Sequence, residues 1–294
     1  MTYQIIHADC IEWLANCPPN SFHACITDPP YGLIEYQSEH LTKRRNGKGG
    51  VWRIPPSFDG SNRQPLPRFT VLSDLDLENL SSFFLQWAGL LLPTLAPGAH
   101  VFIASNPLVS HLVWTSMVRA GFEKRGEIIR LVRTFRGGDR PKGAELEFGE
   151  ISAMPRSAFE PWGLFRKPFE GTLAQNLRNW GTGGLRRPNA EVPFTDVIAS
   201  SRTPQEERAI APHPRLKPQK FLRQLVWASL PTGRGKILDP FAGSGSTLAA
   251  AEALGYDSLG IEADEEYYAL AKKSIPRLAK IATPVTFLAL EGHD

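Results

Sequence analysis

The chain has 294 residues, 42% of them hydrophobic, and is long enough to bury the core of one large domain. Its 33 basic and 30 acidic residues leave a net charge of only +3, so the total charge does not identify a partner. No apolar run approaches the roughly 18 residues of a membrane-spanning helix, and the first residues lack the basic and apolar regions of a signal peptide. We therefore expect a cytoplasmic protein with no membrane partner.

Charge is distributed unevenly along the chain. Basic residues gather between positions 119 and 142, whereas the segment from Asp239 onward leans acidic. This distribution suits a polyanion on one side of the protein and a cationic or hydroxyl-bearing ligand on the other.

All three cysteines, Cys10, Cys17 and Cys25, fall within the first 25 positions. Even with His7 and His23 nearby, their spacing matches no compact set of zinc ligands. We expect Cys10 and Cys25 to be buried free thiols, and we expect no metal site.

Apolar runs alternate with helical patterns, which predicts an α/β fold with a mostly parallel, twisted central sheet and helices on both faces. The predicted strands are Tyr3–His7, His23–Thr27, His100–Ser105, Lys236–Asp239 and Asp257–Glu262. The predicted helices are Leu77–Leu92, Leu108–Ala120, Gln219–Ser229, Ser246–Leu254 and Glu265–Leu278.

Two segments do not follow this alternation of strands and helices. Residues 36–69, rich in Gly, Pro and Arg, predict a mobile loop, and residues 136–211 predict an insertion that recognises a target and does not carry the main sheet.

The stretch "TDPPYG", residues 27–32, follows the predicted strand His23–Thr27. Two consecutive prolines exclude the interior of a helix or of a paired strand. Asp, Pro and Gly are ordinary turn residues, so the hexapeptide alone fits a plain turn as well as a site.

A second motif, "DPFAGSGST", begins where a predicted strand ends at Asp239. Gly243 and Gly245 let a ligand approach the backbone, and the following helix points its free N–H groups at the same crevice. The next strand ends at Glu262, where an acid can accept hydrogen bonds from a ribose diol. The motif lacks the lysine of a phosphate-binding loop. A dinucleotide-binding fingerprint would have a third small residue where Leu248 stands, which weakens that interpretation. A positively charged nucleoside such as S-adenosylmethionine fits best.

Three stretches in this order, "DPPYG", "HPRLKPQKFLRQLVWASLP" and "ILDPFAGSGSTLAAAEALGYDSLGIEADEEYYALA", resemble the β class of S-adenosylmethionine-dependent DNA amino-methyltransferases, which act on adenine N6 or cytosine N4. The middle of the chain resembles the class more loosely, through "EPWGLFRKP" and "WGTGGLRRP". The resemblance implies a Rossmann-like methyltransferase fold. Its parts would be a catalytic domain of residues 1–135 and 212–294, a catalytic loop at 27–32, a cofactor half at 212–294, a target-recognition insertion at 136–211 and a DNA-contacting loop at 36–69.

The resemblance also implies roles for the residues that match. Asp28 and the carbonyl of Pro29, held rigid by Pro29 and Pro30, would accept hydrogen bonds from the two protons of the target amine. Tyr31 would stack on a base flipped out of the duplex. The implied cofactor residues are Asp9, Cys10, His213, Lys217, Pro218, Asp239, Phe241, Gly243, Ser244, Gly245, Ser246, Thr247 and Glu262, with Lys217 directed at the methionine carboxylate. Asp9 equally fits the N-cap of a helix, and His213 fits a structural role. The implied DNA contacts are Lys43, Arg44, Arg45, Lys48, Arg136, Arg140, Arg186 and Arg187.

Double-stranded DNA is thus the expected partner, and S-adenosylmethionine the expected cofactor, in a bacterial or phage-type enzyme associated with the nucleoid. Adenine N6 is favoured because Asp28 rather than a serine precedes the two prolines, and cytosine N4 is left open. Methylation of RNA or of protein glutamine, and a DNA-binding module without catalysis, are remoter alternatives. A homodimer and a cognate restriction endonuclease are also left open.

Overall fold

The computed structural model describes residues 3–30, 72–136, 140–141 and 143–283. The strands are β1 (Tyr3–His7), β2 (Phe22–Thr27), β3 (Leu95–Ala104), β4 (Glu123–Arg136), β5 (Ser157–Arg166), β6 (Val197–Ala199), β7 (Lys236–Asp239) and β8 (Asp257–Glu262). The helices are α1 (Cys10–Ala15), α3 (Asp74–Thr94), α4 (Ser110–Arg119), α5 (Leu173–Trp180), α6 (Gln205–Ile210), α7 (Gln219–Ser229), α8 (Ser246–Ala253) and α9 (Glu265–Ala279).

The eight strands form one sheet in the order β1-β8-β7-β2-β3-β5-β4-β6. Every neighbouring pair is parallel except the two pairs that β5 makes with β3 and β4. The predicted strands of the parallel half are confirmed, and β1, β7 and β8 have the predicted bounds. The prediction of a mostly parallel central sheet is therefore confirmed.

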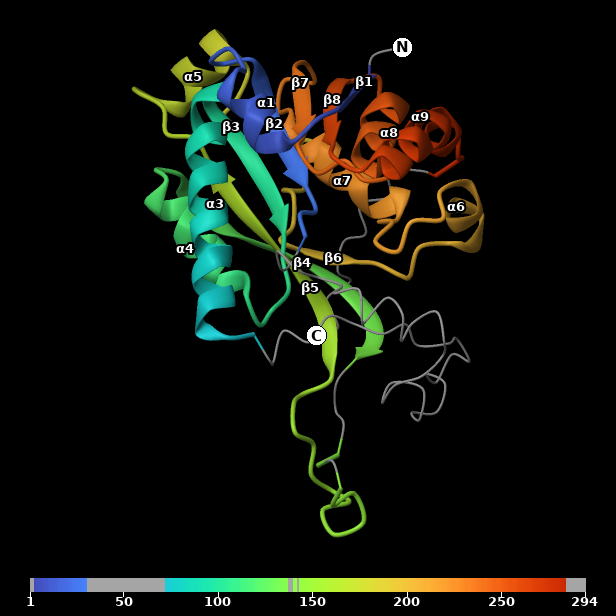
Figure 1. The fold of residues 1–294 in the computed structure, drawn as a ribbon. Coiled ribbons are helices and arrows are strands. Elements are labelled where there is room, and N and C mark those ends of the chain that lie inside the picture. The colour runs from blue at the N-terminus through green and yellow to red at the C-terminus, as the bar shows by residue number, and fades with distance from the viewer. Residues whose placement is uncertain (1–2, 31–71, 137–139, 142, 284–294) are drawn as a thin grey trace.

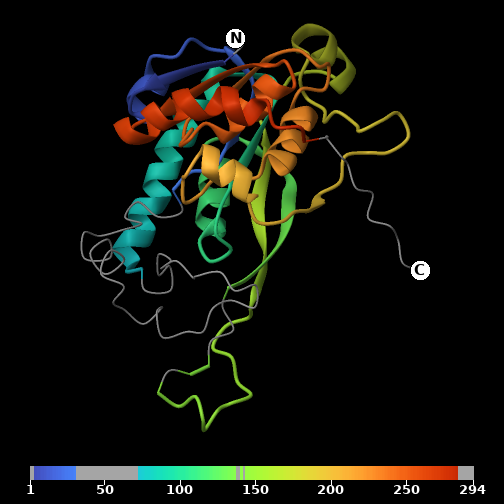
Figure 2. The same ribbon diagram turned by 90° about the vertical axis from the view of Figure 1, so that its right-hand side faces the viewer.

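Helices cover both faces of the sheet (Figures 1 and 2). Successive side chains of a strand point to opposite faces, so Val101 of β3 packs in the cluster formed with α3 and α4, and Phe102 packs in the cluster formed with α7. Cys25 and Ile26 of β2 divide between the same two clusters. A two-sided apolar core of this kind requires cover on both faces, which confirms the predicted layers.

The prediction that residues 136–211 do not carry the main sheet is wrong. β5 lies inside the sheet between β3 and β4, and β6 forms an edge strand. Pro161 and Gly163 lie within β5 although both weaken a strand pattern, because proline removes a ladder hydrogen bond and glycine has no side chain to pack. The backbone between β4 and β5 instead leaves the sheet as a projecting arm (Figure 1), and Leu146 within this segment is almost fully exposed.

The glycine at position 163 has a packing reason. A Cβ atom there would lie 2.6 Å from the ring of Phe165 and 2.7 Å from the ring of Trp114 on α4. Both rings are buried and lie 5.7 Å apart, so neither has space to move away. Close approach of a helix to the strand backbone thus accounts for this residue in β5.

The thiols of Cys10 and Cys25 are buried and unbridged, as predicted, and Cys17 is half-buried. Among the helices within the described ranges, none combines the length and the apolar composition needed to cross a bilayer.

We predict that Gly163→Ala lowers the free energy of unfolding by about 1–3 kcal/mol, because the added methyl group overpacks a buried contact between β5 and α4. Urea unfolding followed by circular dichroism measures the change.

Gly89→Ala is the matched control for this substitution. Gly89 lies exposed in the interior of α3, and a Cβ atom there meets nothing within 4 Å. Alanine at this position is expected to stabilise the protein by up to about 1 kcal/mol. Equal effects of the two substitutions would contradict the packing explanation.

Candidate active site

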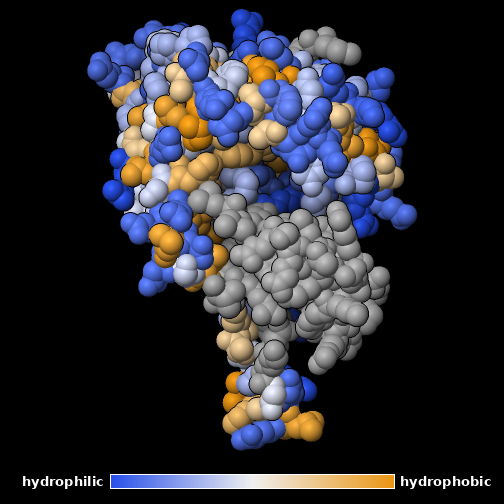
Figure 3. Space-filling model, viewed as in Figure 1, coloured by the Kyte–Doolittle hydropathy of each residue, from blue (hydrophilic) through white to orange (hydrophobic). Residues whose placement is uncertain are grey.

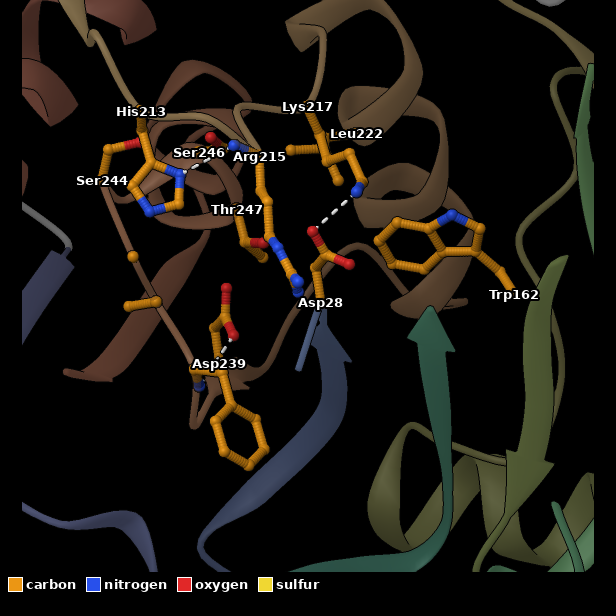
Figure 4. Close-up of a pocket in the computed structure, with 13 residues that line it drawn as sticks. Asp28, Trp162, His213, Arg215, Lys217, Leu222, Asp239, Ser244, Ser246 and Thr247 are labelled. Carbon is orange, nitrogen blue, oxygen red and sulfur yellow. Dashed lines mark hydrogen bonds and ion pairs between the residues drawn. The ribbon is translucent and has the colours of Figure 1, made fainter. Parts of the chain in front are cut away.

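The carboxyl ends of the parallel strands meet at one edge of the sheet, where ligands of open α/β sheets bind. Asp28 directly follows β2, Asp239 ends β7 and Glu262 ends β8. A pocket opens at this edge, and hydrophilic residues lie within the hollow on the face shown in Figure 3. Its lining residues are Asp28, Trp162, His213, Arg215, Lys217, Leu222, Asp239, Phe241, Ala242, Gly243, Ser244, Ser246 and Thr247 (Figure 4).

Thr27 and Asp239 join the two predicted motifs. The Thr27 hydroxyl donates a buried hydrogen bond of 2.7 Å to Oδ1 of Asp239, and the backbone N–H of Phe241 donates to the same oxygen at 3.2 Å. Burial raises the pKa of Asp239 to about 7, although these hydrogen bonds act in the opposite direction. The carboxyl group of Asp239 is therefore partly protonated near neutral pH and serves to fix the motif turn.

The glycine-rich turn leads into α8 at the side of the pocket. Gly245 occupies the N-cap position of α8 with φ 81°, and a Cβ atom there would lie within 2.6 Å of Ile275. The N-cap therefore supplies no side chain, which leaves the N–H groups of the first helical turn without a local cap. The buried Ser244 hydroxyl has no hydrogen-bond partner among the described residues. Such unsatisfied donors fit a bound polar ligand.

Glu262 connects this turn to the end of β8. Its Oε2 accepts a hydrogen bond of 2.7 Å from the Gly243 N–H, and its Oε1 accepts one of 2.9 Å from the Asp264 N–H. Burial raises the pKa of Glu262. The side chain is thereby held at the strand end, in the place from which the ribose contact was predicted.

Asp9 and Cys10 begin α1, beside the end of β1. The Asp9 carboxylate caps this helix by accepting hydrogen bonds from the N–H groups of Ile11 and Glu12. Burial, together with the nearby charges of Asp9 and Glu262, raises the pKa of Cys10 to about 12, so this thiol is not a nucleophile. The N-cap role of Asp9 is thus present, and its contact with a ligand stays a prediction.

The segment before α7 covers the glycine-rich turn. Burial lowers the pKa of His213 to about 4, so the ring is neutral at physiological pH. This ring contacts Tyr267 edge-on and lies 3.4 Å from where a Cβ atom of Gly243 would be. Pro218 immediately precedes α7 and is buried. The predicted His213 and Gly243 are therefore brought together.

The loop after β2 contacts two cations of the segment that precedes α7. Lys217 Nζ lies 2.6 Å from Oδ2 of Asp28, and Arg215 donates a hydrogen bond of 3.3 Å to the carbonyl oxygen of Pro29. The other oxygen of Asp28, Oδ1, is buried and accepts no hydrogen bond from the described residues. Figure 4 shows Lys217 directed at Asp28, whereas its predicted contact with the methionine carboxylate stays a prediction.

Sequence reasoning missed several residues of the pocket. Trp162, Arg215, Leu222 and Ala242 line it. Thr27 contacts its Asp239, and Glu160 contacts its Lys217. Arg215, Leu222 and Ala242 lie inside the stretches that carried the resemblance, so proximity to those motifs could have identified them. Trp162 and Glu160 come from β5, and only the pairing of the strands brings them here.

The structure separates the predicted DNA contacts. Tyr31, the loop 36–69 and its basic residues Lys43, Arg44, Arg45 and Lys48 lie outside the described residues. Arg136 ends β4, and Arg140 is exposed at the start of the projecting arm. Arg186 stacks on Trp227 at 3.6 Å and donates a hydrogen bond to the Tyr256 hydroxyl, beside the beginning of β8 and thus at the opposite edge of the sheet. Arg187 is exposed beside it.

Comparison with known proteins agrees with this geometry. The N6/N4 family model described as DNA methylase matches residues 153–273. The type II methyltransferase M2.DpnII of Streptococcus pneumoniae is 24% identical over 271 residues, which cover 92% of this chain and 88% of that protein.

Two solved structures have the same fold. The M1.HpyAVI–SAM complex matches with a TM-score of 0.57 and 18% identity over 93% of this chain and 98% of that one. The cytosine-N4-specific PvuII DNA methyltransferase matches with a TM-score of 0.59 and 14% identity over 95% of this chain and 92% of that one. The Rossmann-like fold expected from the sequence is therefore confirmed, and the comparisons support the resemblance of this chain to the amino-methyltransferases of the N6/N4 class.

Proposed function

We propose that this protein transfers a methyl group from S-adenosylmethionine to the N6 amine of an adenine that has been flipped out of double-stranded DNA. The observation that carries the proposal is the pair of acceptors at the end of β2. Asp28 Oδ1 is buried without a hydrogen-bond partner among the described residues, and the Pro29 carbonyl stands beside it in the chain. Both belong to the edge of the sheet that holds the glycine-rich turn.

Two acceptors suit the chemistry of an exocyclic amine. The lone pair of such an amine is delocalised into the ring, which makes the nitrogen a poor nucleophile. Hydrogen bonds from its two protons to Asp28 and to the Pro29 carbonyl favour a pyramidal nitrogen with a localised lone pair. Fixed acceptors also stabilise the positive charge that develops on nitrogen during the transfer. Tyr31 would stack on the flipped base.

Arg215 occupies one of these acceptors in the structure. Its guanidinium donates to the Pro29 carbonyl at 3.3 Å. A carbonyl oxygen has two lone pairs, so the amine of the base can use the second one.

The fit of the cofactor rests on the uncapped start of α8 and on the buried Ser244 hydroxyl. Glu262 would hold the ribose, with Asp9 and Cys10 beside the adenine ring. The methionine part would lie against His213, Pro218 and the turn, whose residues are Asp239, Phe241, Gly243, Ser244, Gly245, Ser246 and Thr247. When bound, S-adenosylmethionine supplies an electrophilic methyl group on its sulfonium. The protein then contributes mainly by positioning the amine in line with that group.

The choice of adenine over cytosine follows from the acid before the two prolines. Cytosine N4 remains the second candidate, because the amine of cytosine needs the same two acceptors. The similarity of the fold to the cytosine-N4-specific PvuII DNA methyltransferase supports keeping this alternative. With duplex DNA as its partner, the protein would act in the bacterial cytoplasm. Arg136 and Arg140 are the DNA contacts that we propose among the described residues. A homodimer and a cognate endonuclease stay predictions.

We predict that Asp28→Asn reduces the rate constant of single-turnover methyl transfer by at least about 100-fold, because the charge that stabilises the developing cation is lost. Transfer of labelled methyl groups to duplex DNA at saturating cofactor measures the rate. Affinity for S-adenosylmethionine by calorimetry should change little. Asp257→Asn, at the opposite end of a parallel strand, is the control and should retain the wild-type rate. Wild-type activity of Asp28→Asn would refute the proposed role.

Glu262→Gln should weaken the binding of S-adenosylmethionine by about tenfold to a hundredfold, because hydrogen bonds to a charged group contribute about 1.5–3 kcal/mol. Calorimetric titration measures the dissociation constant. Glu266→Gln, on the exposed first turn of α9, is the control with an unchanged constant. Equal affinities for both variants would exclude Glu262 as a ligand of the ribose.

Expression of the gene in a host without other DNA methylation, followed by single-molecule sequencing, identifies the modified base. We expect N6-methyladenine at one sequence. N4-methylcytosine would replace the first candidate by the second, and unmodified DNA would contradict both.

A further inference from the structure

Four buried charges of alternating sign extend from the catalytic loop into β4 and β5. Asp28 Oδ2 lies 2.6 Å from Lys217 Nζ, the same ammonium lies 3.3 Å from Oε2 of Glu160, and this oxygen lies 3.4 Å from Nη1 of Arg130. The side chains are between 7% and 18% exposed. Two carboxylates and two cations balance to zero, which is the arrangement that buried charges require.

Glu160 is also held through its other carboxylate oxygen. Its Oε1 accepts a hydrogen bond of 2.8 Å from Nε1 of Trp162, whose ring is fully buried. Burial acts to raise the pKa of Glu160, but the charges of Lys217 and Arg130 hold it below its ordinary value. The carboxylate is therefore ionised and fixed in orientation.

Arg130 anchors the far end of this chain of charges. It stands directly opposite Glu160 in the pairing of β4 with β5. Its Nε donates to the Ser200 hydroxyl at 3.0 Å, its Nη2 donates to the Ser201 carbonyl at 2.9 Å, and its guanidinium lies over the ring of Phe221. The position of Glu160 is consequently set by rigid elements of the sheet.

We propose that Glu160 is a positioning residue for methyl transfer, which acts through Lys217 to present Asp28 Oδ1 to the target amine. This inference rests on the proposed function and names a residue of the site that the catalytic motifs do not contain. Lys217 binds Oδ2 of Asp28, so the plane of the carboxylate is fixed while Oδ1 stays available.

Sharing the ammonium also matters electrostatically. A lysine that neutralised Asp28 alone would oppose the positive charge that develops on the amine during transfer. A second carboxylate 3.3 Å from the same ammonium offsets this opposition. Glu160 thus lets Lys217 orient Asp28 without cancelling its charge.

We expect Glu160→Gln to lower the single-turnover rate constant about tenfold to a hundredfold at saturating DNA and cofactor, the order expected when a reacting group is misplaced by about 1 Å. The dissociation constants for S-adenosylmethionine and DNA should stay within about twofold of the wild type. Glu160→Asp keeps the charge. If the carboxylate is required, this variant should retain more activity than Glu160→Gln.

Glu123→Gln is the matched control. Glu123 forms an ion pair with Arg166 across the same two strands, at the end remote from the pocket. Its removal should leave the rate constant within about twofold of the wild type. A loss equal to that of Glu160→Gln would attribute both effects to the stability of the sheet and overturn the proposal.

A double-mutant cycle with Lys217→Met tests whether Glu160 acts through Lys217. Once Lys217 is absent, Glu160→Gln should cost no further activity, because the ammonium through which Glu160 acts on Asp28 is already gone. Losses that multiply would show that Glu160 acts independently. A loss confined to the affinity for S-adenosylmethionine would assign Lys217 to the cofactor and also refute the inference.

The outcomes separate this inference from the proposed function. If Asp28→Asn is inactive and Glu160→Gln is fully active, only the role of Glu160 is wrong. If Asp28→Asn is fully active, the proposed function itself is wrong. Thermal unfolding checks that each variant is folded, and Glu160→Asp replaces Glu160→Gln in the cycle if the glutamine variant does not fold.

Discussion

Parallel pairing of β2 with β7 is the constraint on which the rest of the site depends. The two strands are separated by more than two hundred residues, yet their carboxyl ends come to the same edge of the sheet. The buried hydrogen bond between Thr27 and Asp239 links those ends directly, at 2.7 Å. The loop that begins at Asp28 is thereby fixed against the glycine-rich turn. The proposed function requires the amine and the methyl donor to lie in one pocket, and the parallel pairing at this edge makes that possible.

Two acids at that edge have different surroundings and hence different roles. Asp239 is buried among hydroxyl and N–H donors, and its pKa is raised to about 7. Asp28 has the ammonium of Lys217 at 2.6 Å and a second oxygen that accepts no hydrogen bond from the described residues. Environment therefore distinguishes the two carboxyl groups: Asp239 fixes the turn, and Asp28 is the proposed hydrogen-bond acceptor for the substrate amine.

Much of the parallel half of the fold could be predicted from sequence, because its signals are local. β7 and β8 have their predicted bounds, since each is a short apolar run that ends in an acid and a turn. Asp239 and Glu262 end these two strands, whereas Asp28 was identified through the resemblance that the motifs carry together. β5 was missed because Pro161 and Gly163 are typical of irregular segments, and the ring of Trp114 that explains Gly163 comes from a distant helix.

Glu160 shows why the remainder of the site could not be predicted. In the sequence it is an acid within "FEPWG" with no motif around it, and an isolated acid is more often solvated than functional. Its meaning depends on Arg130 opposite it in β4 and on Lys217 from the segment before α7, contacts that exist only after both strands have joined the sheet. Burial makes these contacts obligatory, because removing one charge leaves its neighbour unpaired in a region of low dielectric constant. The charges proposed to orient Asp28 are for that reason a property of the whole sheet, whereas the two proposed acceptors, Asp28 and the Pro29 carbonyl, are adjacent in the sequence.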